Sequence, residues 1–168
     1  MTREKIMRLL IVSGITVLID QISKAVIVRF LSYGENINLI PGFFNITYVL
    51  NAGGAFGLFA QQSQLVRVMM FLVLSMIAVG FIFYLYHGVP RSHPMLANAL
   101  ALILGGAIGN LIDRIRMGRV VDFLDCYIKH FHWPAFNVAD SAICVGVGIF
   151  IYHIVFKKMP EEGSHPLF

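Results

Sequence analysis

Four long apolar stretches dominate the sequence, and each is long enough to cross a lipid bilayer as a helix. They run over residues 7–30, 65–86, 95–112 and 138–155. A transmembrane helix needs about 20 mostly apolar residues, because every backbone polar group inside the bilayer must find its partner within the segment. The stretches therefore predict an all-α membrane protein with four transmembrane helices.

The composition points the same way. Hydrophobic residues make up 58% of the chain and charged residues 13%, against about 45–50% and about 25% in soluble domains. The 168 residues suffice for a single integral membrane domain, 1–168, ending in a polar tail over 157–168. The net charge of +4 suggests contact with anionic lipid and a role in membrane orientation, not nucleic-acid binding.

The N-terminal segment predicts a retained signal anchor, because its apolar run is too long for a signal peptide and no small-residue cleavage site follows it. Four spans place both termini on one side, which we expect to be cytoplasmic. Cationic residues divide almost evenly, with Arg3, Lys5, Arg8, Arg91, Lys157 and Lys158 on that side and Arg29, Arg67, Arg114, Arg116, Arg119 and Lys129 on the other. The orientation therefore rests on the N-terminal cluster and the short 87–94 turn.

With this topology, polar residues from three spans and two connections gather at the outer face. They are Asp20, Asn51, Asn110, Asp113, Arg114, Asp122, Asn137 and Asp140. A carboxylate in an apolar setting is costly, so it is usually paired, protonated or functional. Asp20 and Lys24 are four residues apart on a predicted helix and are expected to pair, either as a purely structural ion pair or in support of an active site.

Asp122 and Asp140 each lie at the border of an apolar segment and suggest an aspartic protease. Two neighbouring carboxylates cannot both ionise easily, so one can activate water while the other, protonated, polarises the scissile carbonyl. Simpler interpretations stay open on spacing alone. Asp140 could be a first-turn acid behind an N-cap at Asn137, and Asp122 could be a surface acid beside Arg119.

Other polar residues near these acids have possible supporting roles. Asn51 and Asn137 could orient a peptide or stabilise a tetrahedral oxygen. Arg114 could hold a carboxylate ionised or bind a peptide carbonyl, or form with Asp113 a plain interfacial anchor. Gly53 belongs to a glycine-rich stretch that would let the backbone approach a ligand closely, or would only serve a tight turn.

The two long connections, 31–64 and 113–137, differ in pattern. Partial alternation of aromatic and β-branched residues over 43–49 predicts a short strand or two, whereas the second connection is predicted to be a polar loop. A zinc site from Asp125, His130 and His132 is poorly supported, since no HExxH motif is present.

The main alternative function is a small proton- or ion-coupled transporter that uses Asp20, Lys24 and Asp140 as a relay. It predicts ionisable residues spread through the depth of the membrane.

Five motifs together resemble bacterial lipoprotein signal peptidase, also called signal peptidase II. They are Asp20-Gln21-x-x-Lys24, Asn51-x-Gly53-x-Ala55-Phe56, Gly109-Asn110-x-x-Asp113-Arg114, Val121-Asp122-Phe123 and Phe136-Asn137-x-Ala139-Asp140-Ser141. Each motif alone is weak, but they follow the family's order across nearly the whole chain.

The resemblance implies a monomeric aspartic endopeptidase of the bacterial inner membrane, with no cofactor and no metal. Its partners would be membrane lipid and prolipoprotein signal peptides, cut just before a diacylglyceryl-modified cysteine. Asp122 and Asp140 would be the catalytic pair near the extracytoplasmic face, while the supporting or substrate-binding residues would be Asn51, Gly53, Asn110, Arg114, Asn137, Asp113, Asp20 and Lys24. The family also implies a small extracytoplasmic β-sheet and a short surface helix within 31–64.

Overall fold

The computed structural model describes residues 1–53 and 63–156. Its helices are α1 (Arg3–Phe30), α2 (Gln64–Gly88), α3 (Pro94–Met117) and α4 (Val138–Phe156). All four are long and apolar enough to cross a membrane. The predicted class, a four-helix membrane protein with a small sheet, is therefore confirmed.

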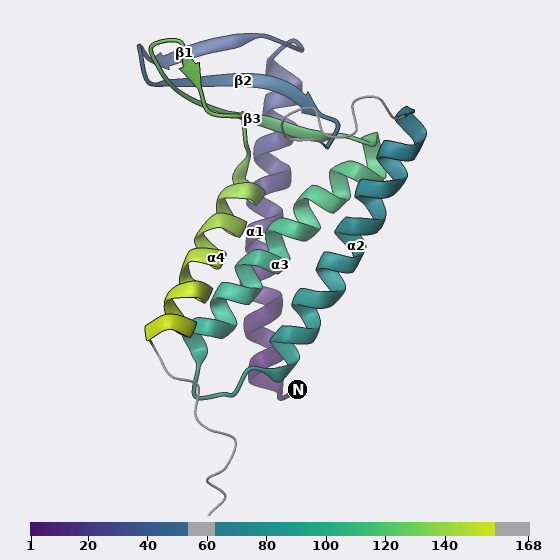
Figure 1. The fold of residues 1–168 in the computed structure, drawn as a ribbon, viewed down its shortest axis with the longest axis vertical. Coiled ribbons are helices and arrows are strands. Elements are labelled where there is room, and N and C mark those ends of the chain that lie inside the picture. The colour runs from purple at the N-terminus through teal and green to yellow at the C-terminus, as the bar shows by residue number, and fades with distance from the viewer. Residues whose placement is uncertain (54–62, 157–168) are drawn as a thin grey trace, which may run out of the picture.

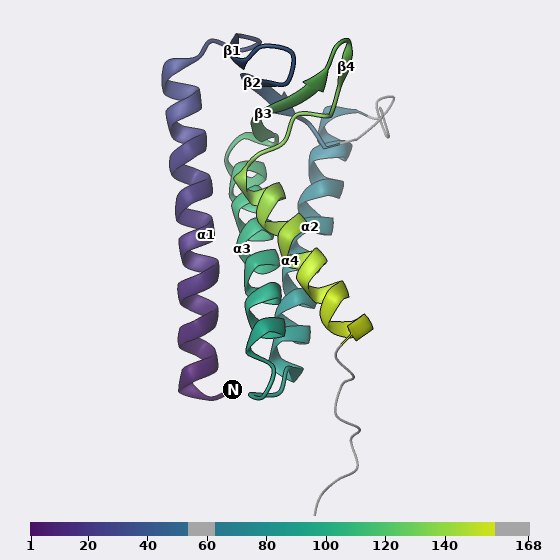
Figure 2. The same cartoon turned by 90° about the vertical axis from the view of Figure 1, so that its left-hand side faces the viewer.

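The helices form a bundle whose one end is covered by the sheet, as both views show (Figures 1 and 2). The start of α1, the α2–α3 turn and the end of α4 all lie at the opposite end of the bundle. Helix α3 is central and packs against α1, α2 and α4. One end of every helix therefore lies at the end of the bundle that the sheet covers, which we call the sheet end.

Helix α1 turns a single stripe of buried residues toward the bundle. The stripe consists of Leu9, Ser13, Thr16, Asp20, Lys24 and Ile27. These positions recur every three or four residues, so they share one helix face, while leucines and isoleucines between them are exposed. Lipid is as apolar as leucine, so the polar stripe packs inward and brings Asp20 and Lys24 against α3.

The sheet is antiparallel in the order β1-β2-β3-β4. Its strands are β1 (Asn36–Ile40), β2 (Phe44–Asn51), β3 (Val120–Ile128) and β4 (Phe131–His132). The expectation that the sheet lies within 31–64 is too narrow, because β3 and β4 come from the second connection. Residues 120–128 are rich in β-branched and aromatic side chains that favour strands, and the carboxylates among them had suggested a loop.

The surface helix expected within 31–64 is not seen in the part of that connection that the structure describes. Residues up to 53 form β1, β2 and turns, and residues 54–62 lie outside the described ranges.

Helix α3 continues beyond its predicted end at residue 112 and leads directly into β3. Gly118 ends the helix in the left-handed conformation (φ 67°), and its N–H donates to the carbonyl of Arg114 at 2.9 Å. Asp113 and Arg114 therefore belong to the last turns of α3, and only a short turn separates them from Asp122.

Candidate active site

The carboxylates of Asp122 in β3 and Asp140 in α4 are held by one residue, Asn137. The Nδ2 of Asn137 donates to Oδ1 of Asp122 at 2.7 Å. Its Oδ1 accepts from the backbone N–H of Asp140 at 2.9 Å, and its own backbone N–H donates to Oδ2 of Asp140 at 3.3 Å. Because Asn137 is fully buried, both acids are fixed relative to each other in one site.

The reciprocal contacts of Asn137 and Asp140 form a capping box at the start of α4. The helix begins at Val138, which makes Asn137 the N-cap and Asp140 the third helical residue. The capping role considered from the sequence is therefore real. It does not occupy the whole carboxylate, since Oδ1 of Asp140 accepts instead from Nδ2 of Asn110 at 2.7 Å.

Asp122 is 2% exposed although it lies in a sheet at the end of the bundle. It is therefore not the surface loop acid that remained open from the sequence. Its Oδ2 accepts from Nδ2 of Asn51 at 3.0 Å. Burial away from water raises the pKa of Asp122 to about 6, even though the amides of Asn51 and Asn137 favour the ionised form. The site thus contains an acid that changes protonation near neutral pH.

Gly53 holds Asn51 in position for this contact. Its N–H donates to Oδ1 of Asn51 at 2.9 Å, which leaves the amide nitrogen of Asn51 for Asp122. Gly53 has φ +79°, and a Cβ there would come within 2.5 Å of the Phe71 ring. Glycine is therefore required at this turn both by its backbone conformation and by the space available.

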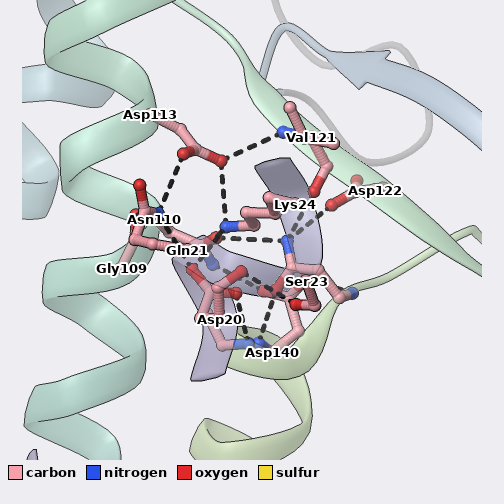
Figure 3. A network of polar contacts seen from close by, with 12 residues as sticks. Asp20, Gln21, Ser23, Lys24, Gly109, Asn110, Asp113, Val121, Asp122 and Asp140 are labelled. Atoms are coloured by element: carbon pink, nitrogen blue, oxygen red, sulfur yellow. Dashed lines mark hydrogen bonds and ion pairs between the residues drawn. The ribbon is translucent and has the colours of Figure 1, made fainter. Parts of the chain in front are cut away.

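A second polar cluster, which we call the support network, lies next to the acids and joins α1 to α3 (Figure 3). Nζ of Lys24 is 2.9 Å from both Asp20 Oδ2 and Asp113 Oδ2, which confirms the expected Asp20–Lys24 pair. Lys24 also donates to Oδ1 of Asn110 at 2.9 Å. All three charged groups are almost fully buried, so removing one partner would leave a buried charge uncompensated.

The support network also reaches α4 and β3 through the backbone. Oδ1 of Asp20 accepts from the N–H of Ala139 at 2.9 Å, next to Asp140. Oδ2 of Asp113 accepts from the N–H of Val121 at 3.2 Å, next to Asp122. Each of these supporting carboxylates therefore holds the chain one residue away from an acid of the pair.

Arg114 is close to the acids but does not pair with Asp113 in the way its sequence position suggested. Its Nη1 donates to the backbone carbonyl of Asn110 at 3.2 Å, while Asp113 is taken up by the support network. Its charge still acts on Asp140, Asp122 and Asp113. The guanidinium therefore contributes positive potential beside the two acids.

A mostly apolar groove of about 870 Å³ opens onto this site. Its lining includes Asn51 and Asp140, and it continues along α4 through Ser141, Cys144 and Val145. The segment over 131–136, which includes β4, also lines it. A groove of this size could admit an extended peptide or lipid chain to the acids.

Sequence reasoning missed Gln21 as part of the site. Its Nε2 lies 3.1 Å from Asp20 Oδ2, from the carbonyl of Gly109 and from Asp113 Oδ1. Two signals in the sequence point to it: its fixed place in the motif Asp20-Gln21-x-x-Lys24, and its position beside Asp20, where an amide in an apolar span needs partners.

The zinc and transporter alternatives gain no support from the arrangement. Among the residues that the structure describes, no group of three or more His, Cys, Asp or Glu side chains is placed to hold a metal ion. The buried acids and Lys24 gather at the sheet end (Figure 3) and do not spread through the membrane depth as a relay would require.

Comparison with known proteins adds independent evidence. The model of a family described as signal peptidase (SPase) II matches residues 12–156. A lipoprotein signal peptidase of Desulforapulum autotrophicum is 48% identical over 161 residues, covering 96% of this chain and 99% of the relative. Another, of Geobacter sulfurreducens, is 45% identical over 143 residues, covering 85% and 88%.

Among solved structures, a bacterial membrane enzyme is similar with a TM-score of 0.78 and 29% sequence identity. The similarity covers 93% of this chain and 94% of that chain. Sequence and fold similarity therefore both extend over the region that holds the two acids.

Proposed function

Because the chain belongs to the signal peptidase II family, we propose that Asp122 and Asp140 are the catalytic pair of its peptidase reaction. The protein is a multi-pass bacterial membrane protein and an aspartic peptidase that cleaves lipoprotein signal peptides. The observation that carries the proposal is that Asn137 holds both carboxylates at once, beside a groove that Asp140 lines.

The reaction needs one proton between the two acids. One carboxylate takes a proton from water as the water oxygen attacks the scissile carbonyl carbon, and the other acid donates its proton to the carbonyl oxygen. The tetrahedral intermediate then collapses. The C–N bond breaks and the amine leaves with the proton from the first acid. A hydroxyl of the intermediate returns a proton to the second acid, and the signal peptide retains the new carboxyl group.

We assign the resting proton to Asp122 and the water-activating role to Asp140. Asp122 is the more buried of the two, and burial favours the neutral form of a carboxyl group. Asp140 is half-buried and lines the groove, where water can reach it.

The remaining site residues would position the pair and the peptide. Asn51, set by Gly53, and Asn110 would orient the acids and contribute donors to the developing oxyanion, and Arg114 would add positive potential. Asp20, Lys24 and Asp113 would keep α1, α3 and α4 in register. Their burial and mutual contacts support this positioning role.

The substrate would be a prolipoprotein cut just before a diacylglyceryl-modified cysteine, with its acyl chains remaining in membrane lipid. The protein would act as a monomer in the bacterial inner membrane, without nucleic acid. Both termini would be cytoplasmic and the sheet extracytoplasmic. The sheet and the start of α1 lie at opposite ends of the bundle, as this orientation requires (Figure 1).

The proposal is tested by cleavage of a purified diacylglyceryl-modified prolipoprotein. Asp122→Asn and Asp140→Asn keep the shape of each side chain but cannot transfer the proton, so we expect each to lower kcat by about a thousandfold or more. Thermal unfolding should show that both variants remain folded.

Glu35→Gln is the matched control, because it also neutralises an acid of the sheet end but at an exposed position. It should cleave like the wild type. Near-normal turnover by either aspartate variant would remove that residue from the catalytic pair.

A further inference from the structure

A second acid–base pair, Asp125 and His132, lies on the sheet and takes no part in the reaction described above. Nδ1 of His132 in β4 is 2.9 Å and 3.0 Å from the two carboxylate oxygens of Asp125 in β3. Asp125 is 7% exposed, and its Oδ2 also accepts from Nδ2 of Asn45 at 2.8 Å. The amide of Asn45 therefore holds the carboxylate of Asp125 in place, and this carboxylate in turn orients His132.

The ring of His132 is held at its edge by Asp125, and its face also packs against another side chain. It stacks on Tyr127 with a centroid distance of 4.8 Å and an angle of 7° between the planes. The hydroxyl of Tyr127 accepts from Nδ2 of Asn38 and from the N–H of Gly42, both at 2.8 Å. Three strands thus contribute to keeping one exposed imidazole in a single orientation.

This orientation leaves one nitrogen of His132 available. A carboxylate can only accept, so Nδ1 must carry the proton that it shares with Asp125. Nε2 has no partner in the part of the chain that the structure describes. The side chain is 49% exposed, so Nε2 can bind a ligand.

His132 also lines the groove that contains Asp140 and Asn51. Within that groove, Cys144 and Val145 belong to a membrane-spanning helix, whereas β4 lies at the sheet end beyond the helices (Figure 2). Asp140 lies in the first turn of α4, ahead of Cys144 and Val145 in the chain. The membrane-embedded part of a substrate in the groove would therefore contact α4. The part of the substrate outside the membrane would contact His132.

We propose that His132, oriented by Asp125, binds the peptide backbone of the lipoprotein on the mature side of the scissile bond. This inference rests on the proposed function of the Asp122–Asp140 site. Nε2 accepts a hydrogen bond when the ring is neutral and donates one when it is protonated. A peptide backbone offers both a donor and an acceptor, whereas the ester oxygens of a lipid only accept. The backbone of the mature segment satisfies His132 in either form.

The test compares two diacylglyceryl-modified substrates with the same signal peptide. One carries its mature segment, and the other ends in an amide directly after the lipidated cysteine. We expect His132→Ala to raise KM for the long substrate about five- to tenfold, as the loss of one hydrogen bond predicts, with kcat nearly unchanged. On the short substrate it should match the wild type.

Two further variants separate binding from structure. His130→Ala removes a neighbouring exposed histidine, whereas the hydrogen bonds of Asp125 in the described structure go to His132 and Asn45, so both substrates should be unaffected. His132→Gln keeps a hydrogen-bond donor and an acceptor. Its KM for the long substrate should therefore lie between those of His132→Ala and the wild type.

Equal KM for wild type and His132→Ala on the long substrate would overturn the proposal. So would an equal rise in KM on both substrates, because that pattern indicates a structural role. If the wild type cleaves neither substrate, the proposed function itself fails, and the inference fails with it.

Discussion

Asp122 combines two opposing requirements in one side chain. Burial raises its pKa to about 6, and this shift suits an acid that must hold and release a proton near neutral pH. The same burial penalises the ionised form in the folded protein. The amide groups of Asn51 and Asn137 reduce this cost without removing it.

A pH-dependent loss of stability follows for the wild type. Well below pH 3.8, the ordinary pKa of this carboxyl group, Asp122 is neutral in both the folded and the unfolded chain, so its ionisation does not affect the stability. As pH rises toward about 6 the unfolded chain ionises first, and folding stability falls by about 2 to 3 kcal/mol at most. Asp122→Asn should lack this loss. Its melting temperature relative to wild type, measured in detergent between pH 4 and 8, should rise and then level off above about pH 6.5.

Glu35→Gln again provides the comparison, since it neutralises an exposed carboxyl group at the sheet end. A difference between Asp122→Asn and wild type that stays constant across the pH range would contradict the raised pKa.

Among the elements, α3 and α4 depend on close backbone contact to bring Asn110 and Asp140 together. Gly106 and Gly146 allow this contact, because a Cβ at Gly106 would meet the carbonyl of Ala139 and one at Gly146 would lie 2.7 Å from that of Ala99. Small residues are a common means of helix packing in membranes, where van der Waals contact replaces the hydrophobic effect.

A matched pair of substitutions in α4 tests this packing. Gly146→Ala should force α3 and α4 apart and destabilise the protein by about 1 to 3 kcal/mol. Gly148→Ala, two positions later on the same helix, has nothing within 4 Å of the new methyl group and should have little effect. Thermal unfolding measures both, and cleavage activity should fall only in Gly146→Ala, because α4 carries Asp140.

If the two variants unfold at the same temperature, close approach at Gly146 is not what holds these helices together.

For the whole molecule, the distribution of charge alone does not fix its orientation, because cationic residues are nearly balanced between the two ends. The architecture adds a stronger constraint. The start of α1 and the α2–α3 turn share one end of the bundle, and the sheet occupies the other (Figure 2). A cytoplasmic N-terminus thus requires the sheet and both acids to be extracytoplasmic.

Labelling of introduced cysteines in a cysteine-free background tests this orientation. Lys129→Cys lies in the exposed β3–β4 turn, and Ser92→Cys lies in the exposed α2–α3 turn. A maleimide that cannot cross the membrane should label Lys129→Cys in intact spheroplasts. It should label Ser92→Cys only after permeabilisation.

The reverse pattern of labelling would place the acids on the cytoplasmic side and overturn the proposed topology.

The number of spans and the acids to examine could be predicted from local patterns in the chain. Apolar length is a local property, since each helix satisfies its own backbone hydrogen bonds. The i,i+4 spacing of Asp20 and Lys24 is equally local, and the structure confirms their contact. Asn137 and Asp140 could likewise be assigned to a helix start from their spacing alone.

How these local features combine depends on contacts between segments that are far apart in the chain. The strand β3 pairs with β2 across some seventy intervening residues, whereas the sequence alone predicted a polar loop around Asp122. The placement of Gln21 between Asp20 and Asp113, and the orientation of His132 by Asp125, likewise depend on which helix face or strand lies opposite. The sequence thus predicted which acids to consider, whereas their geometry follows from long-range packing that no local pattern encodes.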